Sequence, residues 1–518
     1  MAQSCCSAGP RKPAPGDKLD SHFAHDVYPV HLLDQPSGMR QMLTTWVMCF
    51  NDVLDAAQLH ACLCQLLEIG DWRKLGARLR VKHDGLLEAY VPKAFTPQNP
   101  ACLFSHERLL DQYIAAHPAG RHFTLPRTRA FTQTFPPSCR RDLAPPGFPA
   151  TIKDLIRRNL PLLSLHVLSF CDATVVNLSW PENLMDSASF KALLENWSLV
   201  VAGRSQEVAL VFGPYRDVLG ELVQKAEEKR TLKTDDAGSC RCRLPGWWPR
   251  RNLPPKERRM VYIPKDIYED FLNEIRDDIS RLVDDDQRPR TAISDAEILL
   301  AWLSKLHAGG ASKPRGVVAR NMVNLRHHIS SLRDPSGEYL QSLMFPIRSR
   351  LSARDVVESV GKITLMHKRT MDRETREDRL LAMAKSLLED GARGKRVSRA
   401  ARDSRSAHID YSSLASLRLL SAADFGPAVL HCGSLESRRY NPPGTLATAY
   451  CVQVDARPTE SVCRVLGRDS GGHFWMYGQL EPKVWVRLEE ELYRLQKCVN
   501  SLTSGGSVRF SSGPRTRA

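Results

Sequence analysis

Apolar residues recur at the three- and four-residue spacing of an amphipathic helix in several parts of the chain. This spacing predicts six helical stretches, at residues 53–68, 190–201, 264–283, 294–307, 352–390 and 482–499. Asn51 or Asp52 is the expected N-cap of the first stretch. Ser294, with Glu297 three residues later, has the pattern of a capping box, which indicates that a helix begins at that point.

Alternating apolar and polar residues predict strands between these helices. The expected strands lie near residues 75–81, 166–180, 317–325, 414–425 and 446–454. Within residues 166–180, two apolar runs flank Cys171-Asp172-Ala173, so this segment should form a β-hairpin. Because helices and strands are mixed in two blocks, the pattern predicts an α/β fold of two domains joined by one crossover.

Changes in composition divide the 518 residues into five segments. We expect a disordered tail at residues 1–20, an N-terminal domain at 21–230, a basic, Pro-rich crossover linker at 231–260, a C-terminal domain at 261–500 and a second disordered tail at 501–518. The length fits two core-bearing domains, and the 42% apolar and 25% charged residues are ordinary for a globular protein.

The net charge of +15 is concentrated in a few segments. Residues 241–259 carry a net charge of +6, residues 391–405 carry +5 and residues 501–518 carry +3, so the rest of the chain is nearly neutral. These segments are predicted as linker, loop and tail, and the last two lack interleaved aromatic residues. We therefore expect no nucleic-acid partner. The first two remain candidates for attracting a phosphorylated ligand, with plain solvated loops as the alternative.

Several classes of protein are disfavoured by the sequence. The first 20 residues contain no apolar core of a secretory signal, and no stretch approaches the roughly 18 uncharged apolar residues of a membrane span. The 14 cysteines include no CxxC pair, so we expect no structural zinc site and reduced cysteines in a cytoplasmic protein. Nucleotide-binding GxGxxG and Walker motifs, the metalloprotease HExxH motif and the hydrolase GxSxG motif are also absent from the sequence.

Three motifs together suggest a family. The first is the segment Leu178–Asp186 (LSWPENLMD), which precedes the helix predicted at 190–201. The second is Asn324-Leu325-Arg326 after a strand, and the third is Asp424-Phe425-Gly426. In this order and spacing they resemble the BAHD-like CoA-dependent acyltransferases, most closely the fungal branch associated with secondary metabolism. The likeness covers about residues 28–495, and it includes Leu33-Asp34, residues 66–79 and Ser294-Asp295.

The resemblance implies an architecture and a chemistry. Members of the family consist of two similar chloramphenicol-acetyltransferase-like α/β domains with a channel between them, into which acyl-CoA and the acceptor enter from opposite sides. The resemblance also implies a monomer that holds no bound cofactor, takes acyl-CoA as co-substrate and acts on a small-molecule natural-product intermediate. In the family signature HxxxD, the His deprotonates the acceptor, whereas the Asp is mainly structural and is paired with an Arg. The DFG-containing motif shapes the second domain.

This chain departs from the signature at the residue that carries the chemistry. Glu182 stands in the position of the His, while Asp186 is kept, and Asp424-Phe425-Gly426 is followed by Pro427 rather than by Trp. A Glu carboxyl has an ordinary pKa near about 4.3, which burial can raise by up to about 3–5 units. A raised pKa would let Glu182 act as a general base or as a general acid.

Three functions remain open from the sequence. The chain could be an acyltransferase with Glu182 as the base, or an enzyme recruited for acid/base chemistry such as cyclisation, isomerisation or dehydration, or an inactive binding or scaffold protein. Asp186 is interpreted as structural, with Arg326 as its candidate ion-pair partner, because a buried unpaired Asp would be costly. Asn324 and Arg326 are interpreted as architectural.

Overall fold

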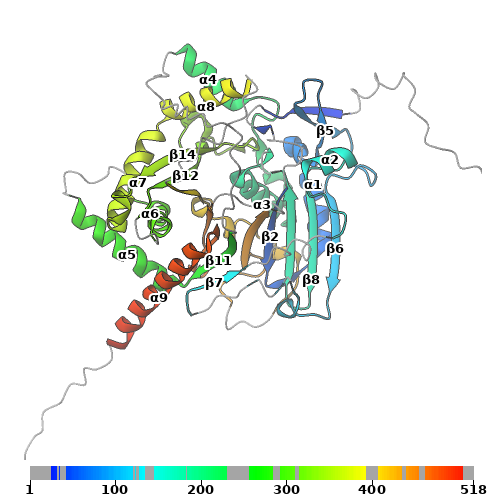
Figure 1. Ribbon diagram of the computed structural model, residues 1–518. Coiled ribbons are helices and arrows are strands. Elements are labelled where there is room, and N and C mark those ends of the chain that lie inside the picture. The colour runs from blue at the N-terminus through cyan, green and yellow to red at the C-terminus, as the bar shows by residue number, and fades with distance from the viewer. Residues whose placement is uncertain are drawn as a thin grey trace, which may run out of the picture.

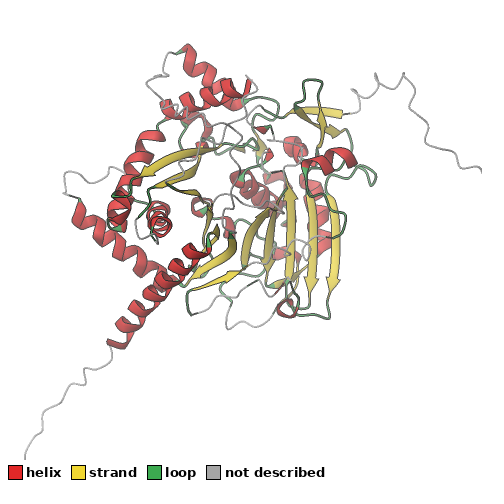
Figure 2. Cartoon of the chain, viewed as in Figure 1, coloured by secondary structure: helices red, strands yellow, loops and turns green. Residues whose placement is uncertain are grey.

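The computed structural model describes residues 25–31, 34–35, 43–118, 120, 123, 128–134, 145–181, 184–229, 256–283, 292–309, 314–392, 406–433, 439–453 and 461–505. These residues form a mixed α/β structure with two large sheets (Figures 1 and 2). None of the described helices is long and apolar enough to cross a lipid bilayer.

The first sheet has five strands in the order β17-β2-β9-β8-β6. They are β17 (Thr448–Gln453), β2 (Thr44–Phe50), β9 (Thr174–Trp180), β8 (Ser164–Phe170) and β6 (Leu103–Leu109). Nearly every residue of β2, β8 and β9 is buried, as expected for strands that are covered on both faces. Helices α1 (Ala56–Leu66) and α3 (Ser187–Val201) pack together in the same core.

A small three-stranded sheet lies at the start of the chain. Its strands, in the order β1-β5-β4, are β1 (His25–Pro29), β5 (Leu87–Pro92) and β4 (Arg78–Val81). Helix α2 (Ile152–Arg158) packs on it and buries Ile152 and Leu155 in a shared apolar cluster. Leu184, which lies between β9 and α3, packs against the same cluster.

The second sheet has seven strands in the order β14-β12-β15-β18-β19-β11-β7. They are β14 (Met344–Leu351), β12 (Val317–Asn324), β15 (Ala407–Ser413), β18 (Ser461–Arg468), β19 (Phe474–Leu480), β11 (Glu257–Ile263) and β7 (Phe131–Thr134). Its core includes side chains from α5 (Lys265–Leu282), α6 (Asp295–Ala308), α7 (Val360–Glu374) and α9 (Pro482–Gly505). Helices α4 (Val218–Glu228) and α8 (Glu377–Ala392) pack on each other in a further cluster.

The two halves of the chain exchange strands. Strand β7 comes from the first half but pairs with β11 in the second sheet. Conversely, β17 and β16 (Val429–Cys432) come from the second half and pair with β2 and with β3 (Asp52–Leu54) of the first. The short strands β10 (Leu210–Val211) and β13 (Gly337–Glu338) add a further pairing between the halves. The two halves are therefore interlocked.

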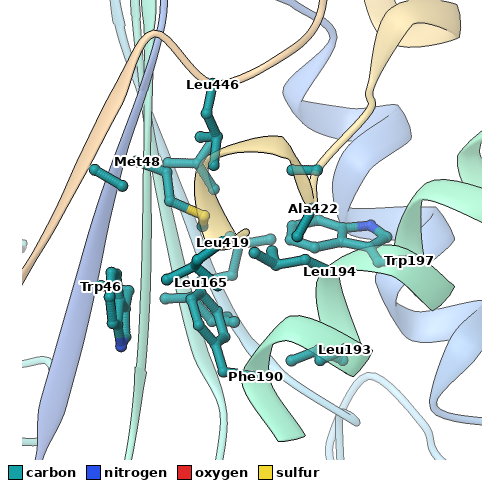
Figure 3. Close-up of a cluster of buried hydrophobic side chains, with 14 of the residues drawn as sticks. Trp46, Met48, Leu165, Phe190, Leu193, Leu194, Trp197, Leu419, Ala422 and Leu446 are labelled. Carbon is teal, nitrogen blue, oxygen red and sulfur yellow. The ribbon is translucent and has the colours of Figure 1, made fainter. Parts of the chain in front are cut away.

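The largest apolar core lies where these exchanged segments meet. Leu419, Ala422 and Leu446 of the second half pack with α3 and with the inner face of the first sheet (Figure 3). The partners on α3 and the sheet are Trp46, Met48, Leu165, Phe190, Leu193, Leu194 and Trp197. Because this core contains side chains from both halves of the chain, neither half could bury this part of its apolar surface alone.

Most of the predicted helices and the hairpin are confirmed. Strands β8 and β9 pair antiparallel around residues 171–173, and Ser294 and Glu297 form the expected capping box of α6. The strand predicted near 317–325 is β12, and the one near 446–454 is β17. The charged stretch at 352–390 contains two helices, α7 and α8.

Three local predictions are wrong. Residues 414–425 are not a strand but contain two 3₁₀ turns, Ala415–Leu417 and Leu419–Ser421. The N-cap of α1 is Asp55, because Asp52, Val53 and Leu54 form β3. Leu75 lies inside the 3₁₀ helix Gly70–Gly76, so β4 starts only at Arg78. In each case contacts with distant parts of the chain override the secondary structure that the local sequence pattern favours.

The predicted segment boundaries fall largely on residues that the structure does not describe. The tail at 1–20, most of the linker at 231–260, the basic residues at 393–405 and residues 506–518 lie outside the described ranges. Strand β11 begins at Glu257, inside the range predicted for the linker, and α9 continues to Gly505. The domain boundaries themselves stay a prediction.

His367 of α7 gives the second half a pH-sensitive element. Its Nδ1 lies 2.7 Å from the Ser349 Oγ and its Nε2 lies 3.1 Å from the Ser304 Oγ, and burial lowers the pKa of His367 to about 4. Unfolding restores a pKa of about 6.5, so between pH values of about 6.5 and about 4 the unfolded chain binds one more proton than the folded chain. The free energy of unfolding therefore falls as the pH is lowered through this range.

We expect this histidine to account for about 2 kcal/mol of pH dependence between about pH 7 and about pH 4.5. Urea unfolding of the wild type and of His367→Gln measures this, because Gln keeps hydrogen-bonding capacity without titrating. The wild type should lose about 2 kcal/mol more than the variant over that range. An identical pH dependence in both proteins would contradict the assignment.

Candidate active site

Asp186 begins helix α3 and is almost fully buried. Its Oδ1 accepts hydrogen bonds from the backbone N–H groups of Ala188 (3.0 Å) and Ser189 (2.9 Å), and from the Ser189 hydroxyl (3.0 Å). A carboxylate in the N-cap position satisfies the first amides of a helix and interacts favourably with the positive end of its dipole. The direction in which α3 leaves β9 is therefore fixed by this residue.

Arg326 pairs with Asp186 across the two halves of the chain. Its Nη1 donates to the Asp186 Oδ2 at 2.9 Å, and the backbone N–H of Leu343 donates to the same oxygen at 2.9 Å. Both partners are nearly inaccessible, with 5% of the Asp186 side chain and 11% of the Arg326 side chain exposed. The ion pair expected from the sequence is confirmed.

The Asn324 side chain and nearby backbone carbonyl groups complete the hydrogen bonds of Arg326. Arg326 lies in a 3₁₀ turn, Leu325–His327, directly after β12, and the Asn324 Oδ1 accepts from its backbone N–H (3.1 Å) and its Nη1 (3.2 Å). Its Nη2 donates to the carbonyl oxygens of Tyr339 (2.8 Å) and Gln341 (2.9 Å). We call Asp186, Arg326 and these partners the Asp186–Arg326 clamp.

The clamp keeps Asp186 ionised. Burial alone would raise the pKa of Asp186, but the Arg326 guanidinium and the N–H groups of Leu343 and Ser189 outweigh burial and hold the pKa below its usual value. Both oxygens of the carboxylate are occupied by hydrogen-bond donors. Asp186 is therefore suited to a structural role and not to proton transfer.

Glu182 and Asn183 lie outside the described residues, whereas Pro181 before them and Leu184 after them are described. Trp180 ends β9, packs on Phe190 with ring centres 4.7 Å apart and donates its indole N–H to the Met185 carbonyl at 2.9 Å. The Leu184 N–H donates to the Pro181 carbonyl at 2.9 Å. The described chain is thus held in place up to Pro181 and again from Leu184 onward.

The third motif packs against the opposite end of α3. Phe425 is fully buried between Trp197 (ring centres 4.7 Å apart) and Phe50 (5.4 Å). The Asp424 N–H donates to the Ser198 hydroxyl, and the Asp424 Oδ1 accepts from the Gly426 N–H. The motif therefore attaches the second half of the chain to α3 and lies away from Asp186.

Gly444 allows the backbone of the third motif, Asp424-Phe425-Gly426, to approach the turn at residue 444 closely. Its φ is +75°, and a Cβ there would lie 2.3 Å from the Gly426 nitrogen, so no other residue fits without displacement. The Phe425 N–H donates to the Gly444 carbonyl at 2.8 Å. Nearby, the buried Asp52 accepts from both terminal nitrogens of Arg439, each at 2.6 Å, and from the Gly444 N–H at 2.7 Å.

Truncating Phe425 should strongly destabilise the protein. Phe425→Ala is expected to lower the free energy of unfolding by about 3–5 kcal/mol, because it opens a cavity between the halves. Leu430→Ala on β16 is the matched control, since Leu430 is 63% exposed and should cost less than about 0.5 kcal/mol. Chemical denaturation measures both, and a Phe425→Ala loss as small as that of the control would contradict the packing role.

The sequence patterns did not predict a role for several other polar residues near the clamp. Asp34, named above only as part of the family likeness, is buried. Burial raises its pKa well above the ordinary value, and Lys74 opposes the rise while Asp186 adds to it. On the neighbouring strands, the Thr45 and Ser179 hydroxyl oxygens lie 2.7 Å apart. The only local signal for Asp34 is a charged residue directly after the largely apolar segment 30–33, and nothing local marks Lys74.

The part of the chain that the structure describes holds no group of three or more His, Cys, Asp or Glu residues that could bind a metal ion. His327 and His328, adjacent in sequence, lie beside Arg326 and Arg333, whose charges act with burial to lower the pKa of His327. In the described part of the chain, the candidate site therefore consists of the Asp186–Arg326 clamp and the polar groups around it.

Comparison with known proteins gives relatives over nearly the whole chain, although no protein-family model matches it. The chain is 28% identical over 491 residues to the O-acetyltransferase PaAT-2 of Phomopsis amygdali, covering 90% of this chain and 98% of that protein. It is 27% identical over 501 residues to the acetyltransferase BOT5 of Botryotinia fuckeliana, covering 90% of each.

A solved structure shares the fold. The crystal structure of F. sporotrichioides TRI101 complexed with coenzyme A and T-2 superimposes with a TM-score of 0.59 and 15% sequence identity, covering 89% of this chain and 97% of that one. The architecture expected from the sequence, two chloramphenicol-acetyltransferase-like α/β units, is thereby confirmed. Along nine-tenths of its length the chain is thus similar to fungal proteins named acetyltransferases, and it shares the fold expected from its resemblance to the BAHD-like acyltransferases.

Proposed function

We propose that the protein transfers an acyl group from acyl-CoA to a hydroxyl or amine of a small-molecule natural-product intermediate, with Glu182 as the general base. The main support is the near full-length similarity to O-acetyltransferases, joined with a clamp that fixes the residue four positions after Glu182. Because several relatives carry the name acetyltransferase, acetyl-CoA is the donor to test first.

The proposed reaction needs only one titrating group. The Glu182 carboxylate removes the proton from the acceptor hydroxyl, and the oxygen attacks the thioester carbonyl carbon. The tetrahedral intermediate then collapses, the carbon–sulfur bond breaks, and the CoA thiolate takes the proton back from Glu182. The acceptor gains the acyl group and free CoA leaves, so the protein itself is unchanged.

The clamp determines how Glu182 can reach a useful pKa. An ionised Asp186 close to Glu182 would raise the pKa of Glu182 by charge repulsion, but Arg326 neutralises the Asp186 carboxylate. Little repulsion remains, so desolvation on substrate binding has to supply the rise. We therefore propose that Glu182 becomes an effective base only when acceptor and acyl-CoA have displaced water.

We further propose that the protein acts as a monomer in the cytoplasm. The cysteines that the structure describes are free thiols, which fits a reducing compartment. Size-exclusion chromatography with light scattering tests the first part, and a mass twice that of the chain would contradict it.

Calorimetric titration with coenzyme A and with acetyl-CoA tests the proposed function without knowledge of the acceptor. Saturable binding of one equivalent is expected for each ligand. Binding of neither ligand would remove the basis for acyl transfer and would leave the recruited enzyme or the scaffold protein as the remaining interpretations. If both ligands bind, metabolite profiling of a strain lacking the gene identifies the acceptor as the intermediate that accumulates.

A further inference from the structure

Helices α6 and α7 pack against one face of the second sheet (Figure 1). Ala319 and Ile409 point toward these helices, and so does Ser349, whose hydroxyl lies 2.7 Å from the Nδ1 of His367 on α7. Successive side chains of a strand point to opposite faces of the sheet. The even-numbered residues of β12, β14 and β15 therefore form the other face, and all of them are partly or largely exposed. We call this surface the open face.

The strand register gathers three arginines on the open face. Arg320 of β12 lies directly opposite Arg348 of the antiparallel strand β14, and Val318 lies opposite Arg350. Arg348 and Arg350 are exposed, and 34% of the Arg320 side chain is exposed. Among the described side chains of the open face, Asp410 is the only carboxylate, and it pairs with Arg320. Like charges placed opposite each other on a sheet are destabilising, so this accessible surface favours an anionic ligand.

The open face leads from the Asp186–Arg326 clamp to these arginines. Asn324 ends β12 on the open face, and its Oδ1 accepts from the Arg326 Nη1 at 3.2 Å. Arg320 lies four residues before Asn324 on the same strand, and Arg350 is in register with a residue two positions earlier still. At about 3.3 Å per residue, these arginines lie about 13 Å and about 20 Å along the strands from Asn324.

This separation fits the length of the pantetheine arm of CoA. About 13 bonds join the thioester sulfur to the first phosphorus atom, which is the bond count of about four residues, so the extended arm spans about 15 Å. A thioester next to the clamp therefore places its phosphate groups at the level of the three arginines. Arginine is suited to this contact, because its planar fork donates two hydrogen bonds to one phosphate group.

We propose that Arg320, Arg348 and Arg350 bind the phosphate groups of acyl-CoA on the open face of the second sheet. The inference rests on the proposed function, which supplies acyl-CoA as the ligand. The phosphates lie over β12 and β14, and the pantetheine arm follows β12 toward Asn324. The bound phosphates also screen the repulsion between Arg320 and Arg348.

The test removes two charges from each side of the sheet in turn. Arg348→Gln/Arg350→Gln is the test variant. Arg369 and Arg373 are exposed on α7, which packs against the covered face, so Arg369→Gln/Arg373→Gln is the matched control with the same change in net charge. Acetyl-CoA is titrated into each protein by calorimetry at several potassium chloride concentrations. Salt screening weakens contacts between exposed charges, so the dependence of Kd on salt reports the charged contacts directly.

The wild type and the control should bind acetyl-CoA equally well, whereas Arg348→Gln/Arg350→Gln should bind it at least about tenfold more weakly. The Kd of the test variant should also depend less steeply on salt. If the variant fails to fold, Arg350→Gln alone decides, with an expected loss of at least about threefold.

Two results would overturn the inference. An acetyl-CoA affinity and a salt dependence equal to those of the wild type would show that the arginines only solvate an edge of the sheet, and the proposed function would stand. An equal loss of affinity in the control would show an effect of net charge alone. Failure of the wild type itself to bind acetyl-CoA would contradict the proposed function and this inference together.

Discussion

Glu182→Gln is expected to lower kcat for acyl transfer by about 10²–10⁴-fold, with a much smaller change in the KM for acyl-CoA. The amide has nearly the shape of the carboxyl group but cannot accept the acceptor proton. Steady-state release of free CoA, followed with a thiol reagent, measures the effect. The pH–rate profile of the wild type should show one ionisation that the variant lacks.

Glu182→His is the informative second variant. It places a group with an ordinary pKa near about 6.5 at the same position, so activity should be retained or raised. Full activity in Glu182→Gln would remove Glu182 from the reaction. Turnover of an intermediate without acyl-CoA, lost in Glu182→Gln, would support the recruited acid/base enzyme, and no turnover by any of the three proteins would support the scaffold.

Arg326→Met is expected to destabilise the protein by about 3–5 kcal/mol. The substitution leaves the Asp186 carboxylate buried without its counter-charge, and it releases the carbonyl groups of Tyr339 and Gln341 from their donor. Because Asp186 caps α3, the loss should also loosen the start of that helix. Urea denaturation followed by circular dichroism measures the change.

Arg320→Met provides the control for Arg326→Met. Arg320 lies six residues earlier, on β12, and pairs with Asp410, but 34% of its side chain is exposed. A partly exposed pair of this kind is worth at most about 1 kcal/mol. Equal losses in the two variants would mean that the clamp contributes no more than an ordinary surface pair. A structural role for Arg326 also predicts that Arg326→Lys recovers only part of the stability, because Lys cannot reproduce the forked geometry.

Features that depend on neighbouring residues could be predicted from the sequence. The β8–β9 hairpin follows from two apolar runs around Cys171-Asp172-Ala173, and the start of α6 follows from Ser294 and Glu297. The ion pair between Asp186 and Arg326 joins residues 140 positions apart, and it was expected only because both belong to motifs of a family that the chain resembles.

Features that depend on distant contacts could not be predicted in this way. The apolar residues at 414–425 form 3₁₀ turns because their partners are α3 and the first sheet, which alternation along the chain does not reveal. The same holds for β7 and β17, which belong to the sheet of the other half.

The most direct test of the central claim, acyl transfer, is an incubation of the purified protein with acetyl-CoA and the metabolite that accumulates in a strain lacking the gene. Mass spectrometry should detect that metabolite with one added acetyl group, together with an equal amount of free CoA, and neither product should form with Glu182→Gln. Disappearance of the metabolite without acetylation, or complete lack of turnover while the protein is folded and saturated with acetyl-CoA, would contradict the account.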